Sequence, residues 1–498
     1  MSIRRLFEAL FLVALFAMAM VETLDPDMWW HLRTGEYILA NGLPRQDVFS
    51  FTVPDYAWIT HEWLSQVFMW LVYQAGGLPG LMVVFALLIA LTYWLVYLAS
   101  EGRPYIAAFV VLLAAIAAAI VWGARPQIFN MLFTAVFVFI IERVRQGKLS
   151  HWFLWLTPVI MVVWANAHSG YLLGVVALGT YTVGEALQRG FQFSVFSVQF
   201  SAGGRQEAGN TLAWPQIKEM AVVTALSFLV AVLNPSGPTL WIYPFQTLGS
   251  PSMQQYIQEW QSPNFHATLF WPFAIMVLLG TLTLIFSPKR PSFTDLLLCF
   301  GTAAAGFLSA RHIPLFTVIA APIIARHVTS LVGQTRFTSL ITEPSPADMT
   351  KPARSLAILN WIVLLAAIIG ALAWALVKID NNQEAIARIY PVAAVDFLEE
   401  TGLAQEPGYN SYNWGGYLIW RGLPVFIDGR ADVYGDDFIF YYLKTLELQE
   451  DWRKPLDDYD VTYVIMETGS QLNTVLAASG EWQEAYADDV AQVFVRIK

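Results

Sequence analysis

Two aspartates, Asp25 and Asp27, stand one residue apart at the end of the first apolar segment. Carboxylates this close can share a divalent cation such as magnesium or manganese, or one can act as a general base while the other orients it. Aspartate also caps helices, and Asp27 directly precedes a helix that we expect to begin at Met28, so capping is an equal alternative. His31 follows Asp27 by one helical turn and shares its face.

His61 and Glu62 begin a second stretch of helical pattern. The zinc motif HExxH requires a second histidine where this chain has Ser65, so zinc-dependent hydrolysis is excluded. The pair could instead hydrogen-bond the two aspartates or a substrate hydroxyl, although Glu62 also suits the start of a helix by its charge. We therefore take Asp25, Asp27, His61 and Glu62 as candidate catalytic residues, with the two aspartates as candidate metal ligands.

Arg311 and His312 separate two apolar segments that have almost no loop between them. Arginine binds a phosphate through two hydrogen bonds and stays charged in a partly apolar site, which fits a lipid phosphate better than a sugar. Arg125 and His168 are expected at the same depth. The alternative is that these side chains only extend to the membrane surface. All four are candidate ligands of a donor phosphate.

The C-terminal part contains the sequence NWGGY from Asn413 to Tyr417, and DGR from Asp428 to Arg430. Paired glycines allow close backbone approach, and aromatic rings suit sugars or peptides. A tight turn is the alternative, because paired glycine is first of all a turn signal. The candidate acceptor-binding residues are Asn413, Trp414, Tyr417, Asp428 and Arg430.

The composition places these residues in a membrane protein. Of the 498 residues, 56% are hydrophobic and 13% are charged, whereas about a quarter are charged in a soluble domain. The single cysteine, Cys299, excludes an intrachain disulfide and a cysteine-based metal site. The sequence has no Walker A motif, dinucleotide-binding glycine pattern or GxSxG motif, so nucleotide hydrolysis and serine-elbow chemistry have no support.

Apolar windows predict about eleven membrane spans, joined by a first outer loop at 23–77 that is too long for a simple connection. Aromatic amphipathic helices are expected in this loop at 28–42 and 61–77, lying in the membrane interface. The predicted spans lie near 5–22, 78–99, 105–122, 127–141, 152–166, 170–186, 218–234, 269–287, 293–309, 313–330 and 356–378.

Basic residues favour a cytoplasmic N-terminus, because they recur in alternate loops as the positive-inside rule requires. They include Arg4, Arg5, Arg103, Arg143, Arg145, Lys148, Arg189, Lys218, Lys289, Arg290, Arg326 and Arg354. This orientation predicts a multi-pass protein of the plasma membrane, of the bacterial inner-membrane type. Most histidines then fall on the outer side, where ionisable groups are costly unless they face a cavity. We expect the candidate residues to converge on one such cavity, although outer loops are also polar in general.

The chain is predicted to divide into a membrane domain at 1–380 and an extracytoplasmic domain at 381–498. The second part holds 20 acidic and 8 basic residues, unlike the nearly neutral first part. Its patterns predict a helix over 393–402, strands over 424–429, 460–466 and 491–497, and a short helix from Leu472. Strands interleaved with helices are typical of a small α/β domain.

This organisation resembles the GT-C superfamily of membrane glycosyltransferases: a short cytoplasmic N-terminus, an acidic motif in a long first outer loop, many spans and a C-terminal outer domain. The resemblance implies a polyprenyl-phosphate-linked sugar donor, with Asp25 and Asp27 at the position of the catalytic or metal-binding motif. The NWGGY segment is similar to the WWDYG region of the oligosaccharyltransferase catalytic subunit, which contacts an acceptor peptide, but it lacks the acidic residue.

The resemblance implies a transferase in which Arg311, with Arg125 or His312, stabilises the departing phosphate and Asp25 or Asp27 accepts the acceptor's proton. The expected partners are the lipid-linked sugar, a glycan, lipid or protein acceptor, and the bilayer, with no nucleic acid. Two alternatives remain: a transporter or flippase of lipid-linked glycan, whose charges would line a passage, and a catalytically silent GT-C-like scaffold. The sequence shows none of the paired repeats common in transporters.

Overall fold

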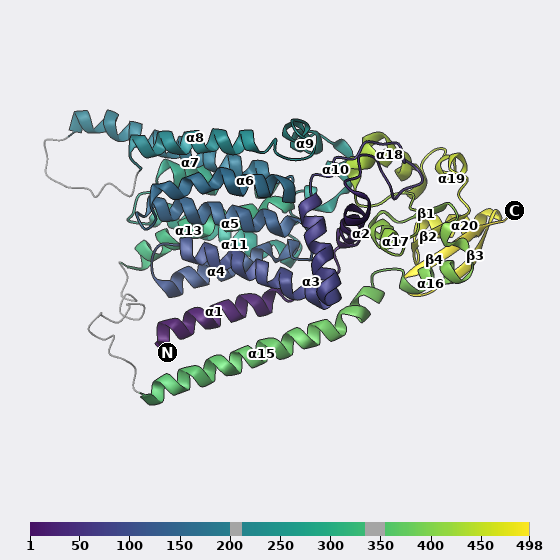
Figure 1. Cartoon of the computed structure of the whole chain (residues 1–498), viewed down its shortest axis with the longest axis horizontal. Coiled ribbons are helices and arrows are strands. Elements are labelled where there is room, and N and C mark those ends of the chain that lie inside the picture. Colours follow the sequence, from purple (N-terminus) through teal and green to yellow (C-terminus); the bar gives the residue numbers. More distant parts are fainter. Residues whose placement is uncertain (200–211, 334–353, 498) are drawn as a thin grey trace.

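The computed structural model describes residues 1–199, 212–333 and 354–497. Long helices run side by side along one axis, and a domain with four strands lies at one end of this bundle, opposite the end that holds the N-terminus (Figure 1). The prediction of a helical membrane domain followed by a small C-terminal domain with helices and a sheet is confirmed. Which end of the bundle faces the cytoplasm stays a prediction.

Each of the eleven predicted windows overlaps one helix, because each is a continuous apolar stretch that satisfies its own backbone hydrogen bonds. Six helical segments in the described part of the chain are long and apolar enough to cross a membrane, so the protein is multi-pass, while the count of eleven stays a prediction. The helices are α1 (Ile3–Ala19), α3 (Trp63–Ala99), α4 (Pro104–Ala118), α5 (Gln127–Arg145), α6 (Leu156–Ala167), α7 (Tyr171–Gln199), α8 (Trp214–Val230), α11 (Trp271–Phe286), α12 (Phe293–Leu308), α13 (Ile313–Val332) and α15 (Arg354–Ala387).

Shorter elements connect these helices and build the C-terminal domain. The α-helices among them are α2 (Pro26–Asn41), α9 (Thr239–Leu248), α10 (Pro251–Tyr256), α16 (Val392–Glu400), α17 (Gly415–Trp420), α18 (Ala431–Leu446), α19 (Lys454–Asp458) and α20 (Gln471–Ser479). The 3-10 helices are η1 (Ala119–Val121), η2 (His151–Trp155), η3 (Gln258–Trp260), η4 (Thr268–Phe270), η5 (Ala310–His312), η7 (Leu403–Gln405) and η8 (Tyr412–Trp414).

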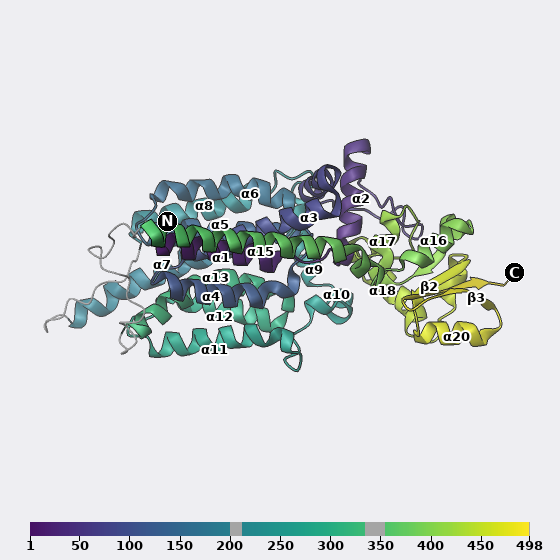
Figure 2. The same ribbon diagram turned by 90° about the horizontal axis from the view of Figure 1, so that it is seen from below.

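The first outer loop contains the two expected helices. Helix α2 lies across the bundle axis, between the long helices and the C-terminal domain (Figure 2). It ends before Gly42, whose φ of 85° favours glycine. The second expected helix is the first part of α3, which leaves helical geometry at Gly77, with a φ of 60°, just before Pro79. The predicted boundary between interfacial helix and span therefore coincides with this kink.

The cap of α2 differs from the expectation. Helix α2 begins at Pro26, and the side chain of Asp25 accepts a hydrogen bond from the backbone N–H of Asp27. The prediction that Asp27 caps a helix starting at Met28 is therefore wrong. The cause is Pro26. Its ring fixes φ at a helical value and it has no N–H to satisfy, so the helix starts two residues earlier than expected.

The C-terminal domain contains a four-stranded sheet in the order β1-β2-β4-β3, in which β1 and β2 are parallel and the other pairs are antiparallel. The strands are β1 (Gly408–Asn410), β2 (Tyr463–Glu467), β3 (Trp482–Ala487) and β4 (Ala491–Arg496). The strands expected at 460–466 and 491–497 and the helices at 393–402 and from Leu472 are present. The prediction of a strand at 424–429 is wrong. This apolar segment is buried but does not join the sheet, and among the described residues it forms only one bridge, from Val425 to Ser50 in the loop after α2.

A buried ion pair fastens this outer loop to the C-terminal domain. Arg430 donates to Asp428 at 2.6 Å and to Asp47 at 2.5 Å, and none of the three side chains is exposed. The Tyr434 hydroxyl also donates to Asp428. A buried charge is tolerated only with such partners. These contacts therefore hold the C-terminal domain against the loop that follows α2.

Helix α15 connects the membrane domain to the C-terminal domain and runs through residue 380, the predicted boundary. It packs mainly against α1, and only 17% of its most apolar window is buried. Its outer end is bonded to the segment before α2: Lys378 pairs with Glu22, and Asn382 accepts hydrogen bonds from Thr23.

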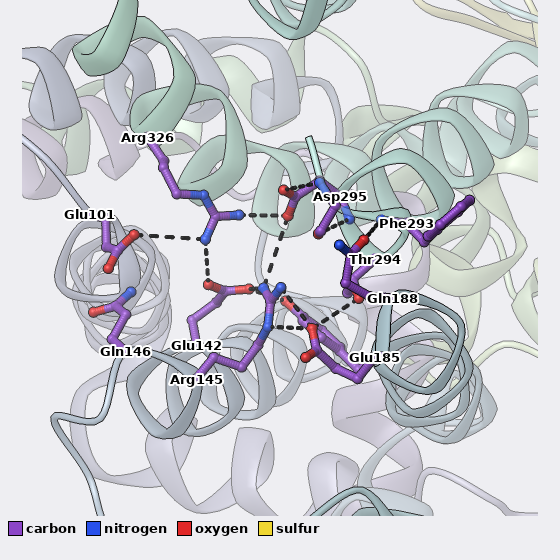
Figure 3. Close-up of polar contacts among 12 residues, drawn as sticks. Glu101, Glu142, Arg145, Gln146, Glu185, Gln188, Phe293, Thr294, Asp295 and Arg326 are labelled. Atoms are coloured by element: carbon purple, nitrogen blue, oxygen red, sulfur yellow. Dashed lines mark hydrogen bonds and ion pairs between the residues drawn. The ribbon is translucent and has the colours of Figure 1, made fainter. Parts of the chain in front are cut away.

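The opposite end of the bundle holds a buried network of charges (Figure 3). Arg145 of α5 pairs with Glu142 at 2.5 Å and with Glu185 of α7 at 2.8 Å. Arg326 of α13 pairs with Asp295 of α12 at 2.6 Å and with Glu142 at 3.3 Å. The network thus joins four helices. The expectation that Arg145 and Arg326 lie in cytoplasmic loops is therefore corrected. Both residues belong to helices, and buried carboxylates neutralise their side chains.

Replacing Arg145 with methionine is expected to destabilise the protein by about 3–5 kcal/mol, because the carboxylates of Glu142 and Glu185 would stay buried without their cation. The measurement is the thermal melting temperature of the purified protein in detergent. Lys148→Met is the control, since Lys148 is exposed just beyond the same helix and a change within about 0.5 kcal/mol is expected there. Equal melting temperatures for the two variants would contradict the role of this network.

Candidate active site

A cavity of about 470 Å³ lies between the membrane bundle and the C-terminal domain. It is bordered by α2, the start of α5, the turn between α6 and α7, the segment from α9 to η3, η5 and two segments of the C-terminal domain. Eight of the candidate residues line it, from parts of the chain far apart in sequence. They are Asp27, His61, Glu62, Arg125, His168, Arg311, His312 and Asn413.

The acidic motif is bound by an arginine. Arg125, just before α5, pairs through Nη1 with Oδ2 of Asp25 at 3.1 Å and through Nη2 with Oδ2 of Asp27 at 3.3 Å. The other oxygens are also occupied: Asp25 Oδ1 accepts from the Asp27 backbone, and Asp27 Oδ1 accepts from the indole N–H of Trp30 at 3.0 Å. Asp27 faces the cavity, whereas Asp25 is outside its lining and positions Asp27 and Arg125.

Asp27 has an unusual proton affinity for an aspartate. Burial raises its pKa to about 7, the positive charge of Arg125 and the Trp30 hydrogen bond oppose the rise, and the carboxylates of Asp25 and Glu259 add to it. A carboxyl group with a pKa near 7 exchanges its proton readily at neutral pH, which is what a general base requires.

The C-terminal domain approaches this motif closely. A side-chain carbon added at Gly429 would lie 2.1 Å from Asp27 Oδ1, and one added at Gly416 would lie 2.4 Å from the backbone oxygen of Pro26. Only glycine allows such contacts. The two glycines therefore let the outer domain cover the N-terminal end of α2.

The two aspartates do not fit a divalent metal in this arrangement. All four carboxylate oxygens accept hydrogen bonds, and the guanidinium of Arg125 stands beside both groups. In the described part of the chain, no group of three or more His, Cys, Asp or Glu side chains could hold a metal ion. The expectation of magnesium or manganese at Asp25 and Asp27 stays unconfirmed, and no step proposed below uses a metal.

Glu62 lies among three histidines on another wall of the cavity. Its oxygens are 3.2 Å from Nε2 of His61, 3.4 Å from Nε2 of His168 and 3.6 Å from Nε2 of His31. Burial lowers the pKa of His31 to about 3 and that of His168 to about 4, so both rings are neutral at pH 7. Burial opposes protonation of His61 as well, but the Glu62 charge and hydrogen bond raise its pKa overall. The group thus places one imidazole of raised pKa, His61, beside one carboxylate.

A third carboxylate, Glu259 in η3, was missed as a site residue. Its Oε2 lies 3.3 Å from Nη1 of Arg125 and its Oε1 lies 3.6 Å from Nη1 of Arg311. Burial works against its ionisation, but the two arginines outweigh burial and lower its pKa. Arg311 also lies over the ring of Trp260 at 4.3 Å. The sequence offered no signal beyond an acidic residue in an aromatic outer segment.

His312 lines the cavity beside Arg311. Its Nδ1 is buried and has no hydrogen-bond partner among the residues that the structure describes. An imidazole with a free ring nitrogen can form a hydrogen bond with a bound molecule.

Four candidate acceptor residues lie away from the cavity. Trp414 is buried and donates to the backbone oxygen of Ile389. Tyr417 packs against aromatic rings of α2 and Tyr390. Asp428 and Arg430 form the buried ion pair with the outer loop. Tyr417, Asp428 and Arg430 thus support the contact between domains, Trp414 is bonded within the C-terminal domain, and only Asn413 of this group reaches the cavity.

Two neighbouring residues reach the cavity although sequence reasoning did not select them. Tyr412 lines it next to Asn413, and its hydroxyl donates to the backbone oxygen of Gly429. Asp432 also lines it and accepts from the Tyr243 hydroxyl at 3.0 Å. Tyr412 adjoins the NWGGY segment, and Asp432 follows the DGR segment. These two sequence patterns therefore located the region of the cavity but not the side chains that line it.

No family model matches the chain, and no curated protein matches it in sequence. Solved structures are similar in fold. The oligosaccharyltransferase of Archaeoglobus fulgidus, tethered with an acceptor peptide containing the NVT sequon, has a TM-score of 0.54 at 12% identity, covering 100% of this chain and 74% of that chain. AglB from the same organism, in complex with an inhibitory peptide and a dolichol-phosphate, has a TM-score of 0.53 at 11% identity, covering 93% and 69%.

ArnT from Cupriavidus metallidurans in the apo state has a TM-score of 0.51 at 14% identity, covering 97% of this chain and 96% of that chain. These proteins are GT-C glycosyltransferases. Identities this low show a shared fold and nothing finer. The chain therefore has the GT-C fold.

Proposed function

We propose that the protein is a glycosyltransferase that moves a sugar from a polyprenyl-phosphate-linked donor to an extracytoplasmic acceptor. The observation that carries this proposal is one cavity lined by a carboxyl group with a pKa near 7, Asp27, and two arginines, Arg125 and Arg311. This set supplies a base for the acceptor and positive charge for the leaving group. AglB, which shares the fold, is solved with a dolichol-phosphate.

The proposed reaction breaks the bond between the sugar and the phosphate oxygen. Arg311 and Arg125 bind the phosphate and stabilise the negative charge that it gains as the sugar leaves. An acceptor hydroxyl attacks the sugar carbon, and its proton passes to Oδ2 of Asp27. This oxygen becomes available when the phosphate draws Arg125 away from the aspartate.

The walls of the cavity fit a lipid-linked donor. Leu172, Leu173, Leu248 and Ile257 contribute apolar side chains to the same lining as the arginines. A polyprenyl chain can lie against such residues while its phosphate reaches the charged group. This supports a membrane donor over a soluble one. No specific observation favours a flippase or a silent scaffold.

The proposed setting is the plasma membrane, of the bacterial inner-membrane type, crossed by about eleven spans with a cytoplasmic N-terminus. The cavity and the C-terminal domain would then be extracytoplasmic. The basic residues that lie between helices in the structure, among them Arg103, Lys148, Lys289 and Arg290, support this orientation. The acceptor stays open between a glycan, a lipid and a protein.

Asp27→Asn is expected to lower the rate of sugar transfer by about 100-fold or more, because asparagine cannot accept the proton. The measurement is turnover of labelled polyprenyl-phosphate sugars by the purified protein, with sugar, lipid and peptide acceptors supplied in turn. Asp55→Asn, an exposed position in the same outer loop, is the control and should retain activity. Turnover that survives in both Asp25→Asn and Asp27→Asn would eliminate the assignment.

The pH dependence of transfer follows from the same group. A base works only when deprotonated, so kcat/KM should rise with pH through about 7, the pKa of Asp27. The Trp30 hydrogen bond lowers this pKa, so Trp30→Phe should move the rise to higher pH. Trp271→Phe, which changes an exposed tryptophan far from the motif, should not. A profile that is flat across neutral pH would argue against Asp27 as the base.

A further inference from the structure

We infer that Glu259 occupies, in the unliganded protein, the position that the donor's phosphate takes, and that it competes with phosphate for Arg125 and Arg311. The inference rests on the proposed function, since it concerns the same cavity. One carboxylate oxygen faces each guanidinium, at 3.3 Å and 3.6 Å. A phosphate between two arginines would present its oxygens in the same way.

The contacts of Glu259 are those of a group that can be displaced. Charge-assisted hydrogen bonds are usually about 2.7–2.9 Å long, so both of its contacts are longer than optimal. Its side chain is 26% exposed, more than that of Arg125 or Arg311. A phosphate offers more charge and more acceptor oxygens to the same arginines, so it can replace the carboxylate.

The backbone around Glu259 is fixed while its side chain is not. The Ser309 hydroxyl donates to the Glu259 backbone oxygen at 2.9 Å, and the Ala310 N–H donates to the Gln261 backbone oxygen at 3.0 Å. These bonds join η3 to η5, the element that carries Arg311. The side chain can therefore leave the arginines by rotation without unfolding the segment.

The two arginines depend on Glu259 to different degrees. Arg125 still has Asp25 as a partner when Glu259 leaves and the phosphate draws the guanidinium away from Asp27. Glu259 is the one carboxylate that pairs with Arg311 in the described part of the chain. Glu259 therefore mainly shields Arg311, which gains a free guanidinium for phosphate when the carboxylate moves away.

The same competition assists product release. When the sugar leaves, its bond electrons stay with the phosphate oxygen, and the polyprenyl phosphate carries more negative charge than the donor did. The product would bind both arginines tightly. As the product departs, the Glu259 carboxylate returns and takes the place of the phosphate oxygens at those arginines. The two cations are therefore never left without a partner.

The test is binding of undecaprenyl phosphate, and separately of inorganic phosphate, to the full-length protein in detergent. Glu259→Gln is expected to bind undecaprenyl phosphate about threefold to tenfold more tightly than the unaltered protein, because no carboxylate competes. If inorganic phosphate shows the same gain, the headgroup alone is recognised; if only the lipid does, the chain is also required. Arg311→Gln should weaken binding, and Glu22→Gln, which removes a carboxylate paired with Lys378, should leave it unchanged.

Glu259→Asp separates displacement from a general charge effect. Aspartate keeps the negative charge but is one carbon shorter, so it cannot reach both arginines, and tighter binding is expected here too. Unchanged or weaker binding by folded Glu259→Gln, as judged by its melting temperature, would overturn the inference. Phosphate binding that responds as expected in a protein without transfer activity would instead count against the proposed function alone.

Discussion

The active-site end of the molecule depends on the pairing of Arg125 with Asp25, Asp27 and Glu259. A cation that is mostly buried, as Arg125 is, needs carboxylates around it to be stable. The three acidic residues come from the start of α2 and from η3, so one guanidinium brings three separate parts of the chain to one point. The outer domain then packs over them through Gly416 and Gly429. The pairing also places two arginines beside a carboxyl group with a pKa of about 7, Asp27.

The bundle has an ionic cluster near each end, and the two clusters differ in geometry. Helix α5 begins next to Arg125 and ends at Arg145, which puts the clusters about 27 Å apart along its axis. The cluster at Arg145 has ion pairs of 2.6 Å and 2.8 Å that join helices, and Arg145 and Glu142 are buried. The one at Arg125 has longer contacts and faces a cavity. Close, dry pairing suits a structural link, whereas loose pairing beside open space suits exchange of partners.

Much of the fold could be predicted because it depends on local properties of the sequence. Apolar length located the helices, the helix expected at 28–42 ended at Gly42, and the boundary expected after residue 77 coincided with the kink of α3. The cavity was also foreseen in outline, since ionisable residues such as Asp27 and Arg311 are costly near a membrane unless they share a polar space.

The rest depends on partners that are distant in sequence. Arg145 resembled a loop cation because nothing nearby shows that Glu185 neutralises it. Asp428 and Arg430 resembled binding residues because their partner, Asp47, lies in the first outer loop. Glu259 drew no attention because its role requires two arginines from two other segments. Residue type and spacing therefore predicted which regions matter, and tertiary pairing decided what each side chain does there.

The slight burial of α15 has a consequence for how the outer domain is held. Helix α15 packs mainly against α1 and is bonded at its end to the segment before α2, so it keeps the domain near the bundle. The orientation of the domain is set by two further contacts. Arg430 pairs with Asp47 in the loop after α2, and Gly416 and Gly429 pack against the start of that helix. Since those surfaces also border the cavity, any displacement of the domain would change the shape of the cavity as well.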